Sequence, residues 1–140
     1  MSLEKTLCIC KPDSLEARKQ GAIVQRLLDE GFTILAMQQV HLTRKQAEGF
    51  YAVHRERPFF EELCKFMTRG PVVVLALARK DAVQTLRTVI GATDPAKAAE
   101  GTVRKLYGKN VGENAVHGSD SVENGALECG YFFPGMNLVQ

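Results

Sequence analysis

The chain has 140 residues, of which 45% are hydrophobic and 24% are charged, and its formal net charge is +2. This length suits one domain with its own core, so we expect a single domain over residues 1–140. The composition is that of an ordinary globular protein, and no apolar run approaches the ~18 residues that a membrane-spanning helix needs.

The first third of the chain predicts two strands with a helix between them. The apolar stretch Lys5–Cys10 predicts a strand that ends at Lys11-Pro12-Asp13, because proline breaks a strand ladder. Gln20–Glu30 places its apolar residues on one helical stripe, and Gly31 follows as a C-cap. Phe32–Leu42 predicts the second strand.

The middle of the chain predicts two helices and a buried strand. Thr43 and Gln46 fit a capping box, so we expect a helix from there to about residue 52. Pro58 can open another helix, which Gly70 ends. The continuous apolar run Val72–Ala78 is typical of a central strand that is buried on both faces.

The last part of the chain contains two long loops. Asp81 suggests the cap of a helix that continues to Ile90, and a loop over residues 91–101 follows. A second loop, rich in Gly, Asn and Ser, is expected over residues 110–121, before a short helix to about Cys129. Strands that alternate with helices favour an α/β fold with a central sheet covered by helices. Long loops inside such a domain tend to be functional.

The cysteines and the N-terminus indicate the compartment. The four cysteines, which form no Cys-x-x-Cys pair, are Cys8, Cys10, Cys64 and Cys129. We therefore expect buried free thiols in a reducing compartment. The first five residues include an acid, and no long apolar segment follows, so we expect no signal peptide and a cytoplasmic protein.

Charge is distributed unevenly over the second half of the chain. Residues 79–109 carry seven Lys or Arg and three acids, whereas residues 110–140 carry four acids and no Lys or Arg. A solvated basic face explains this pattern, and so does a basic segment that receives an anion.

Reactive side chains are densest around His117. Neutral imidazole is a good nucleophile near neutral pH, provided that one nitrogen is free and an acceptor holds the N–H of the other. Glu128, eleven residues further on, is a candidate acceptor, and Ser119 could support it. Taken alone the pattern is weak, since a single histidine in a loop more often has no chemical role.

A second group of residues suits a polyphosphate. Arg87, Thr93 and Arg104 flank the 91–101 loop, and phosphoryl transfer needs cations and hydrogen-bond donors around the transferred oxygens. Lys11 ends the first strand, where α/β proteins often bind ligands. Either arginine could equally be an exposed helix residue, and Lys11 a surface lysine. The sequence contains no Walker-type phosphate loop, so a nucleotide would bind in another way.

Six stretches resemble nucleoside diphosphate kinase in order and spacing over nearly the whole chain. They are Lys11-Pro12-Asp13, residues 54–60 (His-Arg-Glu-Arg-Pro-Phe-Phe), 67–71 (Met-Thr-Arg-Gly-Pro), 91–96 (Gly-Ala-Thr-Asp-Pro-Ala), 101–104 (Gly-Thr-Val-Arg) and 114–123 (Asn-Ala-Val-His-Gly-Ser-Asp-Ser-Val-Glu). The His-Gly-Ser-Asp element is highly specific in this context. The resemblance implies a ferredoxin-like βαββαβ core, with added helices and a long loop before Arg104.

The resemblance also implies a ping-pong reaction. A nucleoside triphosphate would give its γ-phosphoryl group to Nδ1 of His117, and the phosphohistidine would give it to a nucleoside diphosphate. Glu128 with Ser119 matches the pair that orients the nucleophile, and Tyr51 lies close to it. The other matched positions bind substrate: Lys11 and Asn114 the sugar hydroxyls, Arg87, Thr93, Arg104 and His54 the phosphates, and Phe59 with Val111 opposite the base.

Further expectations follow from the same resemblance. Stacking on Phe59 would serve any base and so imply low base selectivity, although a Pro-Phe-Phe run is more often part of a core. Mg²⁺ would be carried by the nucleotide phosphates, without a protein ligand cage. The partners implied are ATP and other nucleoside di- and triphosphates. The short C-terminal tail is similar to that of short bacterial members, which form tetramers or hexamers built from dimers.

Two other functions stay open at this point. The chain could be a non-catalytic module that binds nucleotide or nucleic acid, or a scaffold without activity. The chain lacks an RNP-type aromatic pattern, and its pI of about 8.4 is low for a dedicated nucleic-acid binder, so nucleic acid would be at most a secondary partner. The presence of His117, Arg87, Arg104 and Lys11 argues against an inactive scaffold.

Overall fold

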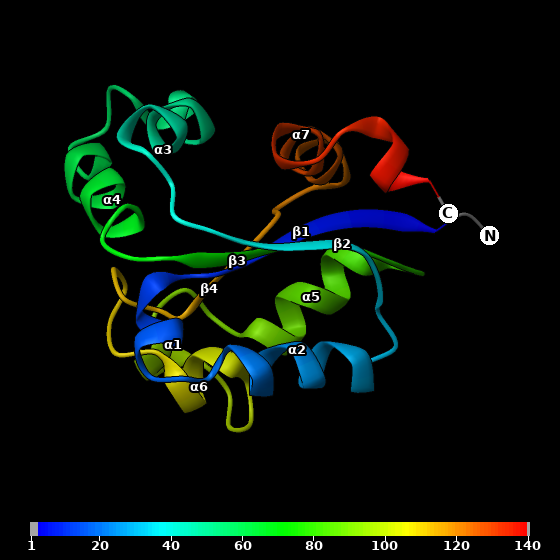
Figure 1. Ribbon diagram of the computed structural model, residues 1–140. Coiled ribbons are helices and arrows are strands. Elements are labelled where there is room, and N and C mark those ends of the chain that lie inside the picture. The colour runs from blue at the N-terminus through cyan, green and yellow to red at the C-terminus, as the bar shows by residue number, and fades with distance from the viewer. Residues whose placement is uncertain (1–2, 140) are drawn as a thin grey trace.

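Four strands form one antiparallel sheet in the computed structural model, which describes residues 3–139 (Figure 1). The strands are β1 (Glu4–Cys10), β2 (Thr33–Val40), β3 (Val72–Arg79) and β4 (Val116–Gly118). Their order across the sheet is β2-β3-β1-β4, and each neighbouring pair is antiparallel. This arrangement confirms the predicted ferredoxin-like α/β sandwich.

Helices cover both faces of the sheet (Figure 1). On one face lie α1 (Pro12–Glu16), α2 (Gln20–Asp29), α5 (Ala82–Ile90) and α6 (Val103–Tyr107). On the other face lie α3 (Arg44–Phe50), α4 (Phe60–Met67) and α7 (Val122–Phe132). Short 3₁₀ helices span Ala52–His54, Pro95–Lys97 and Gly135–Leu138. No helix within residues 3–139 has both the length and the apolar character needed to cross a membrane.

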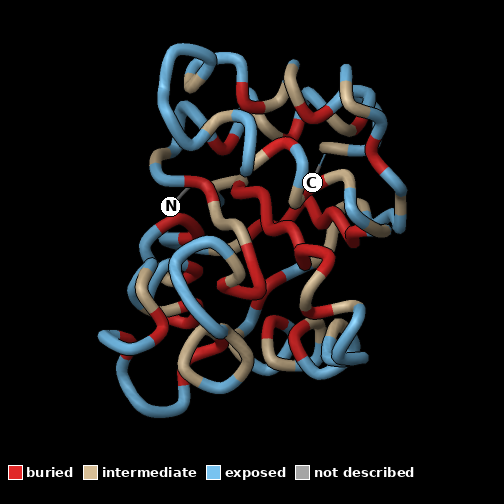
Figure 2. Tube along the Cα trace, turned by 90° about the vertical axis from the view of Figure 1, so that its left-hand side faces the viewer, coloured by how far each residue is buried: buried red, intermediate tan, exposed pale blue. Residues whose placement is uncertain are grey.

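The central strands are buried on both faces, as the apolar run at residues 72–78 predicted. Alternate residues of β1 contribute to two cores: Cys8 and Cys10 face α2 and α5, whereas Leu7 and Ile9 face the other helical layer. Figure 2 shows this buried chain in the middle of the molecule, with exposed segments around it. All four cysteines are buried and free, in agreement with the sequence. Such burial holds the ends of β1 and β4 in a fixed place.

Local signals were correct where they depended on near neighbours. Thr43 and Gln46 form both bonds of the predicted capping box, at 3.1 and 2.9 Å. Gly31 follows α2 with φ of +87°, which favours glycine. Asp81 does occupy the N-cap position of α5, but its side chain makes no capping bond. Instead the Val83 N–H donates to the Glu4 carboxylate at 3.2 Å, a partner from the first strand.

The first strand ends at Cys10, directly before Lys11-Pro12-Asp13, as predicted, and Pro12 then begins α1. Two expectations about the elements were wrong. The predicted loop over residues 110–121 contains β4, which is only three residues long and exists through its pairing with β1. The last helix continues to Phe132 instead of ending near Cys129. The helix α6, begun by Thr102, was not predicted.

Candidate active site

His117 lies on β4, the strand at one edge of the sheet. The pairing with β1 places it opposite Ile9, and Nε2 of His117 is 2.8 Å from Oε1 of Glu128 in α7. The Ser119 hydroxyl donates to the same carboxylate oxygen at 2.7 Å, and the Leu7 N–H donates to the Ser119 hydroxyl at 3.0 Å. A chain of hydrogen bonds thus connects the backbone of β1 with the imidazole.

The Glu128 carboxylate determines which nitrogen of His117 carries the proton. An ionised carboxylate can only accept hydrogen bonds, so Nε2 must be the nitrogen that holds the hydrogen. A neutral imidazole has a single N–H, which leaves a lone pair on Nδ1. The network therefore makes Nδ1 the nitrogen that can attack an electrophile.

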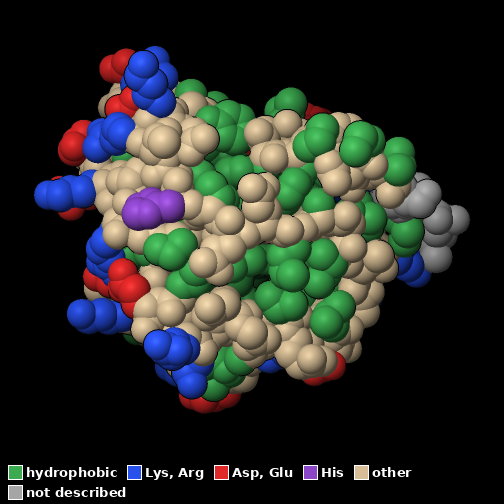
Figure 3. Space-filling view, viewed as in Figure 1, with side chains coloured by type: hydrophobic (Ala, Val, Ile, Leu, Met, Phe, Trp, Pro, Cys, Tyr) green, Lys and Arg blue, Asp and Glu red, His purple; other side chains and the backbone are tan. Residues whose placement is uncertain are grey.

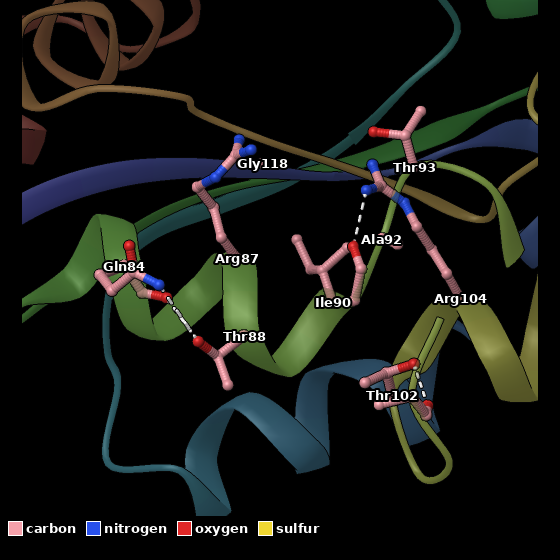
Figure 4. A pocket seen from close by; sticks show the side chains of 11 residues that line it. Gln84, Arg87, Thr88, Ile90, Ala92, Thr93, Thr102, Arg104 and Gly118 are labelled. Atoms are coloured by element: carbon pink, nitrogen blue, oxygen red, sulfur yellow. Dashed lines mark hydrogen bonds between the residues drawn. The ribbon is translucent and has the colours of Figure 1, made fainter. Parts of the chain in front are cut away.

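Two packing contacts restrict the position of the nucleophile. The Phe50 ring meets the His117 ring edge to face, with centroids 5.4 Å apart and planes at 78°. The lack of a side chain at Gly118 helps α5 to approach β4 closely, because a Cβ there would lie 2.7 Å from Cδ1 of Ile90, which would then have to move. This approach brings Arg87, which rises from α5 toward that strand, to the same cleft (Figure 4).

Lys11 and Asn114 connect the end of β1 to two loops. The Lys11 ammonium donates to the Asn114 side-chain oxygen at 2.9 Å, and the Asn114 amide donates to the Thr93 carbonyl at 3.0 Å. Lys11 is 8% exposed and Asn114 is 2% exposed. The pKa of Lys11 is lowered to about 8, mainly by burial and also by the charge of Arg104, while Asp13 opposes both effects. An anion bound beside Lys11 would favour its charged form.

Two arginines face the same region from different elements. Arg104 of α6 donates to the Gly91 carbonyl at 3.1 Å and to the Val116 carbonyl at 2.9 Å. The pKa of Arg104 is lowered to about 10, mainly by burial and in smaller part by the charge of Arg87. Arg87 is exposed and pairs with no acid among residues 3–139. Two cations that form no ion pair in the described part of the chain suit the binding of an anion such as a phosphate chain.

Two adjoining clefts contain most of these side chains. The inner cleft, of about 450 Å³, lies between α5 and the 91–101 loop and reaches Arg87 and Gly118 (Figure 4). The outer cleft, of about 930 Å³, shares Thr93 and Arg104 with it and extends past Lys11 to the loop before β4. The arrangement offers cations at one end and a wider apolar space at the other.

Phe59 and Val111 line the outer cleft from opposite segments, and they are 50% and 57% exposed. Their exposure shows that neither belongs to a core, so a ring bound here could contact both. The structure brings polar side chains to this cleft from further away: Glu62, Lys65, Arg69, Asn110 and Glu113.

A row of aromatic rings connects the nucleophile with the outer cleft. His54 lies between Tyr51 and Phe59, with centroid distances of 6.5 and 5.4 Å. Tyr51 also contacts Phe50, at 4.9 Å. The Tyr51 hydroxyl is buried and has no hydrogen-bond partner within residues 3–139, and burial together with the charge of Glu128 raises its pKa. A buried hydroxyl of this kind can still donate to a ligand.

The predicted site residues come together in space. Seven of them line the two clefts: Lys11, Phe59, Arg87, Thr93, Arg104, Val111 and Asn114. The other five form the nucleophile network and the aromatic row: Tyr51, His54, His117, Ser119 and Glu128. Sequence reasoning missed Phe50 and the role of Gly118 in helix packing. Neither had a local signal, because each acts through a contact distant in the chain.

Known proteins resemble this chain over its whole length. The sequence model described as nucleoside diphosphate kinase matches residues 4–138. A nucleoside diphosphate kinase of Sorangium cellulosum is 64% identical over 139 residues, which cover 99% of this chain and 96% of that protein. One from Persephonella marina is 46% identical over 140 residues, with 100% of both chains covered.

Solved structures agree with the sequences. A crystal form of the Aquifex aeolicus nucleoside diphosphate kinase superposes with a TM-score of 0.95 at 42% identity, covering 99% of this chain and 100% of that chain. A nucleoside diphosphate kinase family protein from Babesia bovis superposes with a TM-score of 0.92 at 33% identity, covering 98% and 93%. The resemblance seen in the sequence motifs is confirmed, and the chain belongs to the nucleoside diphosphate kinase family of phosphotransferases.

Proposed function

We propose that this chain moves the γ-phosphoryl group of a nucleoside triphosphate to a nucleoside diphosphate through a phosphohistidine on His117. The observation that carries the proposal is the bond between Nε2 of His117 and Glu128, which leaves the lone pair on Nδ1. Ser119 supports the carboxylate from the other side. Membership of the family is consistent with this chemistry.

In the first half-reaction, Nδ1 of His117 forms a bond to the γ-phosphorus while the bond to the β-phosphate oxygen breaks. The nucleoside diphosphate leaves with the electron pair of that bond. The imidazole gains positive charge as its lone pair is shared, and the Glu128 carboxylate 2.8 Å away offsets this charge. The second half-reaction is the reverse, with a different diphosphate as acceptor.

Cations and donors at the inner cleft suit the phosphate chain. Arg87 and Arg104 would bind the transferred phosphoryl oxygens, whose charge shifts along the reaction path, with Thr93 and His54 beside them. The unpartnered Tyr51 hydroxyl would lie close to the nucleophile. Lys11 and Asn114, already bonded to each other, would bind the sugar hydroxyls.

The base would stack between Phe59 and Val111. Both are exposed in the outer cleft, and stacking uses a face that every base has, so selectivity among bases should be low. The partners are then ATP and the other nucleoside di- and triphosphates.

Mg²⁺ fits this site only as a companion of the nucleotide. The inner cleft contains two arginines and no acid among its described lining residues, so it would repel a free dication. Carried on the nucleotide, Mg²⁺ would supply positive charge that offsets the charge of the phosphates. Arg87 and Arg104 would hold the phosphates that carry it.

The test is to trap the intermediate. The protein is incubated with Mg²⁺ and ATP labelled in the γ-phosphate, and the labelled protein is isolated and exposed to acid and to alkali. We expect a label that acid removes and alkali preserves, and that GDP discharges as labelled GTP. Label that resists acid, or label retained by a His117→Gln variant, would contradict the proposal.

Assembly and location are also part of the proposal. We propose a homo-oligomer, a tetramer or hexamer built from dimers. Strand β2 forms an edge of the sheet with no strand beside its outer side within residues 3–139, and its Met37 is 53% exposed. Figure 3 shows apolar side chains gathered on the face seen there. Four free, buried thiols suit the cytoplasm. Sedimentation velocity distinguishes the two assemblies, and a monomer at micromolar concentration would reject both.

A further inference from the structure

The residue two positions before the nucleophile has a strained backbone. Ala115 has φ of +74°, in the left-handed region that residues other than glycine rarely adopt. The Val116 N–H donates to the Asn114 carbonyl at 2.9 Å, which closes a three-residue γ-turn around Ala115. The form of this turn with positive φ is rare because it is strained. Such strain persists only where the surrounding structure holds it.

Both peptide groups of Ala115 are held from the end of β1. The Ala115 N–H donates to Oδ2 of Asp13 at 3.0 Å, and the Lys11 N–H donates to the Ala115 carbonyl at 2.9 Å. The second bond continues the β1–β4 ladder, whereas the first depends on a side chain. Asp13 is thus the one side chain among residues 3–139 that bonds the N–H or carbonyl of Ala115 itself, while Arg104 bonds the Val116 carbonyl at the end of the turn.

Both neighbours of Ala115 carry parts of the proposed site. Asn114 precedes it and bonds Lys11, and β4 with His117 follows it. If Ala115 relaxed to a negative φ, the chain on one side would rotate relative to the other. Either Asn114 would leave Lys11, or β4 would lose its register against β1.

One oxygen of the Asp13 carboxyl lowers the stability of the fold. Its Oδ1 is buried without a partner in the described part of the chain, and burial raises the pKa of the carboxyl while the Ala115 N–H lowers it. A buried acceptor without a bond destabilises a protein, so a smaller apolar side chain would avoid this penalty. The contact with Ala115 gives a reason for a carboxylate at this position.

We infer that Asp13 is a positioning residue for phosphoryl transfer, which acts by holding the strained turn at Ala115 between the sugar-binding Asn114 and the nucleophile His117. The inference rests on the proposed function. It assigns no contact between Asp13 and the substrate. The interaction that matters is the acceptor oxygen on the Ala115 N–H, not the charge of the carboxylate.

Four variants test this inference: Asp13→Ala, Asp13→Asn, Ala115→Gly and the double variant Asp13→Ala/Ala115→Gly. The readout is the single-turnover rate of His117 phosphorylation by saturating ATP, per folded molecule. Asp13→Ala should be slower by about 10- to 100-fold, within the range expected when a buried donor, here the Ala115 N–H, is left without an acceptor. Asp13→Asn keeps an acceptor oxygen and should stay within about 3-fold of the unmodified chain.

Glycine adopts a positive φ without steric cost, so Ala115→Gly should compensate for the lost bond. We expect the double variant to be faster than Asp13→Ala by about 5-fold or more. A control, Asp29→Ala, removes an exposed acid of α2 whose bond goes to Gln25, and it should leave the rate unchanged.

Three results would overturn the inference. In one, Asp13→Ala lowers the melting temperature but leaves the rate per folded molecule intact. In another, Asp13→Asn is as slow as Asp13→Ala, which would make charge the relevant property. In the third, the double variant Asp13→Ala/Ala115→Gly is as slow as Asp13→Ala. Failure of the unmodified chain to form phosphohistidine would instead reject the proposed function, so the two failures are distinguishable.

Discussion

The two ends of the proposed nucleotide site differ in how firmly the protein holds them. At the nucleophile end, Ser119 is fully buried and Asn114 is 2% exposed, and each bonds at least one other site residue. At the base end, Phe59 and Val111 are about half exposed, and neither makes a side-chain hydrogen bond by its chemistry. The first region is built into the sheet, and the second is carried by a helix start and a loop.

This difference corresponds to the two tasks. Phosphoryl transfer depends on the position of a nitrogen relative to phosphorus, and a displacement of 1 Å can cost about 100-fold in rate. Stacking tolerates such displacement, because any base presents a broad face. We therefore expect changes at the nucleophile end to affect kcat and changes at the base end to affect KM.

The largest effect should follow the loss of the nucleophile. His117→Ala should retain less than about 1% of the transfer rate, a loss of at least about 2.7 kcal/mol. Because His117 lies on an edge strand and is 20% exposed, the melting temperature should change little. The measurements are turnover with ATP and a diphosphate acceptor, and a thermal melt. A residual rate above that limit would remove His117 from its assigned role.

Substitutions of the two arginines should differ in their effect on stability, although both should slow transfer. Arg87→Ala should raise the activation free energy of transfer by about 2–4 kcal/mol and so lower kcat. Stability should not change, since Arg87 is exposed and unpaired within residues 3–139. Arg104→Ala should lower both kcat and the free energy of unfolding, because it also removes the hydrogen bonds to the Gly91 and Val116 carbonyls. Urea unfolding and steady-state kinetics check both variants. If Arg87→Ala raises KM at unchanged kcat, Arg87 is only a uniform binder.

Lys11 links stability at the nucleophile end to pH. Its pKa is lowered from 10.5 to about 8 in the folded protein, so the unfolded chain binds more protons between these values and stability rises with pH there. Relative to Lys11→Met, which lacks this group, the unmodified chain should gain about 2 kcal/mol in unfolding free energy between about pH 7.5 and pH 10. Urea titrations at both pH values give the difference. An unchanged difference would mean that Lys11 stays protonated despite its burial.

Loss of the stacking residue at the base end should affect KM and not kcat. Phe59→Ala should raise KM by about 5- to 150-fold, the range for one stacked base, with little change in kcat. Acceptors ADP, GDP, CDP and UDP should be affected alike. Phe60→Ala is the matched control, because Phe60 packs against the core and its loss should lower stability instead. An unaffected KM for Phe59→Ala would contradict the expectation that changes at the base end affect KM.

The smallest effect should come from the rim of the outer cleft. Arg69 bonds Glu16 at 2.9 and 2.7 Å and Glu113 at 3.2 Å, which connects α1, the end of α4 and the loop that carries Val111. These pairs are exposed, so Arg69→Met should raise KM by only about 2- to 5-fold, and about 0.5 M salt should remove the difference.

The control for this variant is Arg44→Met, which breaks comparable exposed pairs with Glu48 and Glu61 outside both clefts. Its KM should match that of the unmodified chain at both salt concentrations. A salt-independent effect of Arg69→Met would indicate a direct contact with the nucleotide.

The sequence by itself determined the features that depend on neighbours in the chain. A continuous apolar run was sufficient for β3 and apolar periodicity for α2, and Thr43 with Gln46 marked the start of α3. These signals are carried by residues a few positions apart, where propensity and capping act directly. Six short stretches were sufficient for the family, because they match it in order and spacing over nearly the whole chain.

Only the tertiary structure decided how the site is held. β4 is too short to predict, and it forms because β1 offers a ladder about 110 residues away in the chain. The same pairing gives Ser119 its bond to Leu7, and places Ala115 where Asp13 can hold its unfavourable φ. Local preferences would exclude that φ for alanine. Long-range hydrogen bonds and packing outweigh such preferences, because the pairing of β4 with β1 fixes the position of the backbone next to Ala115.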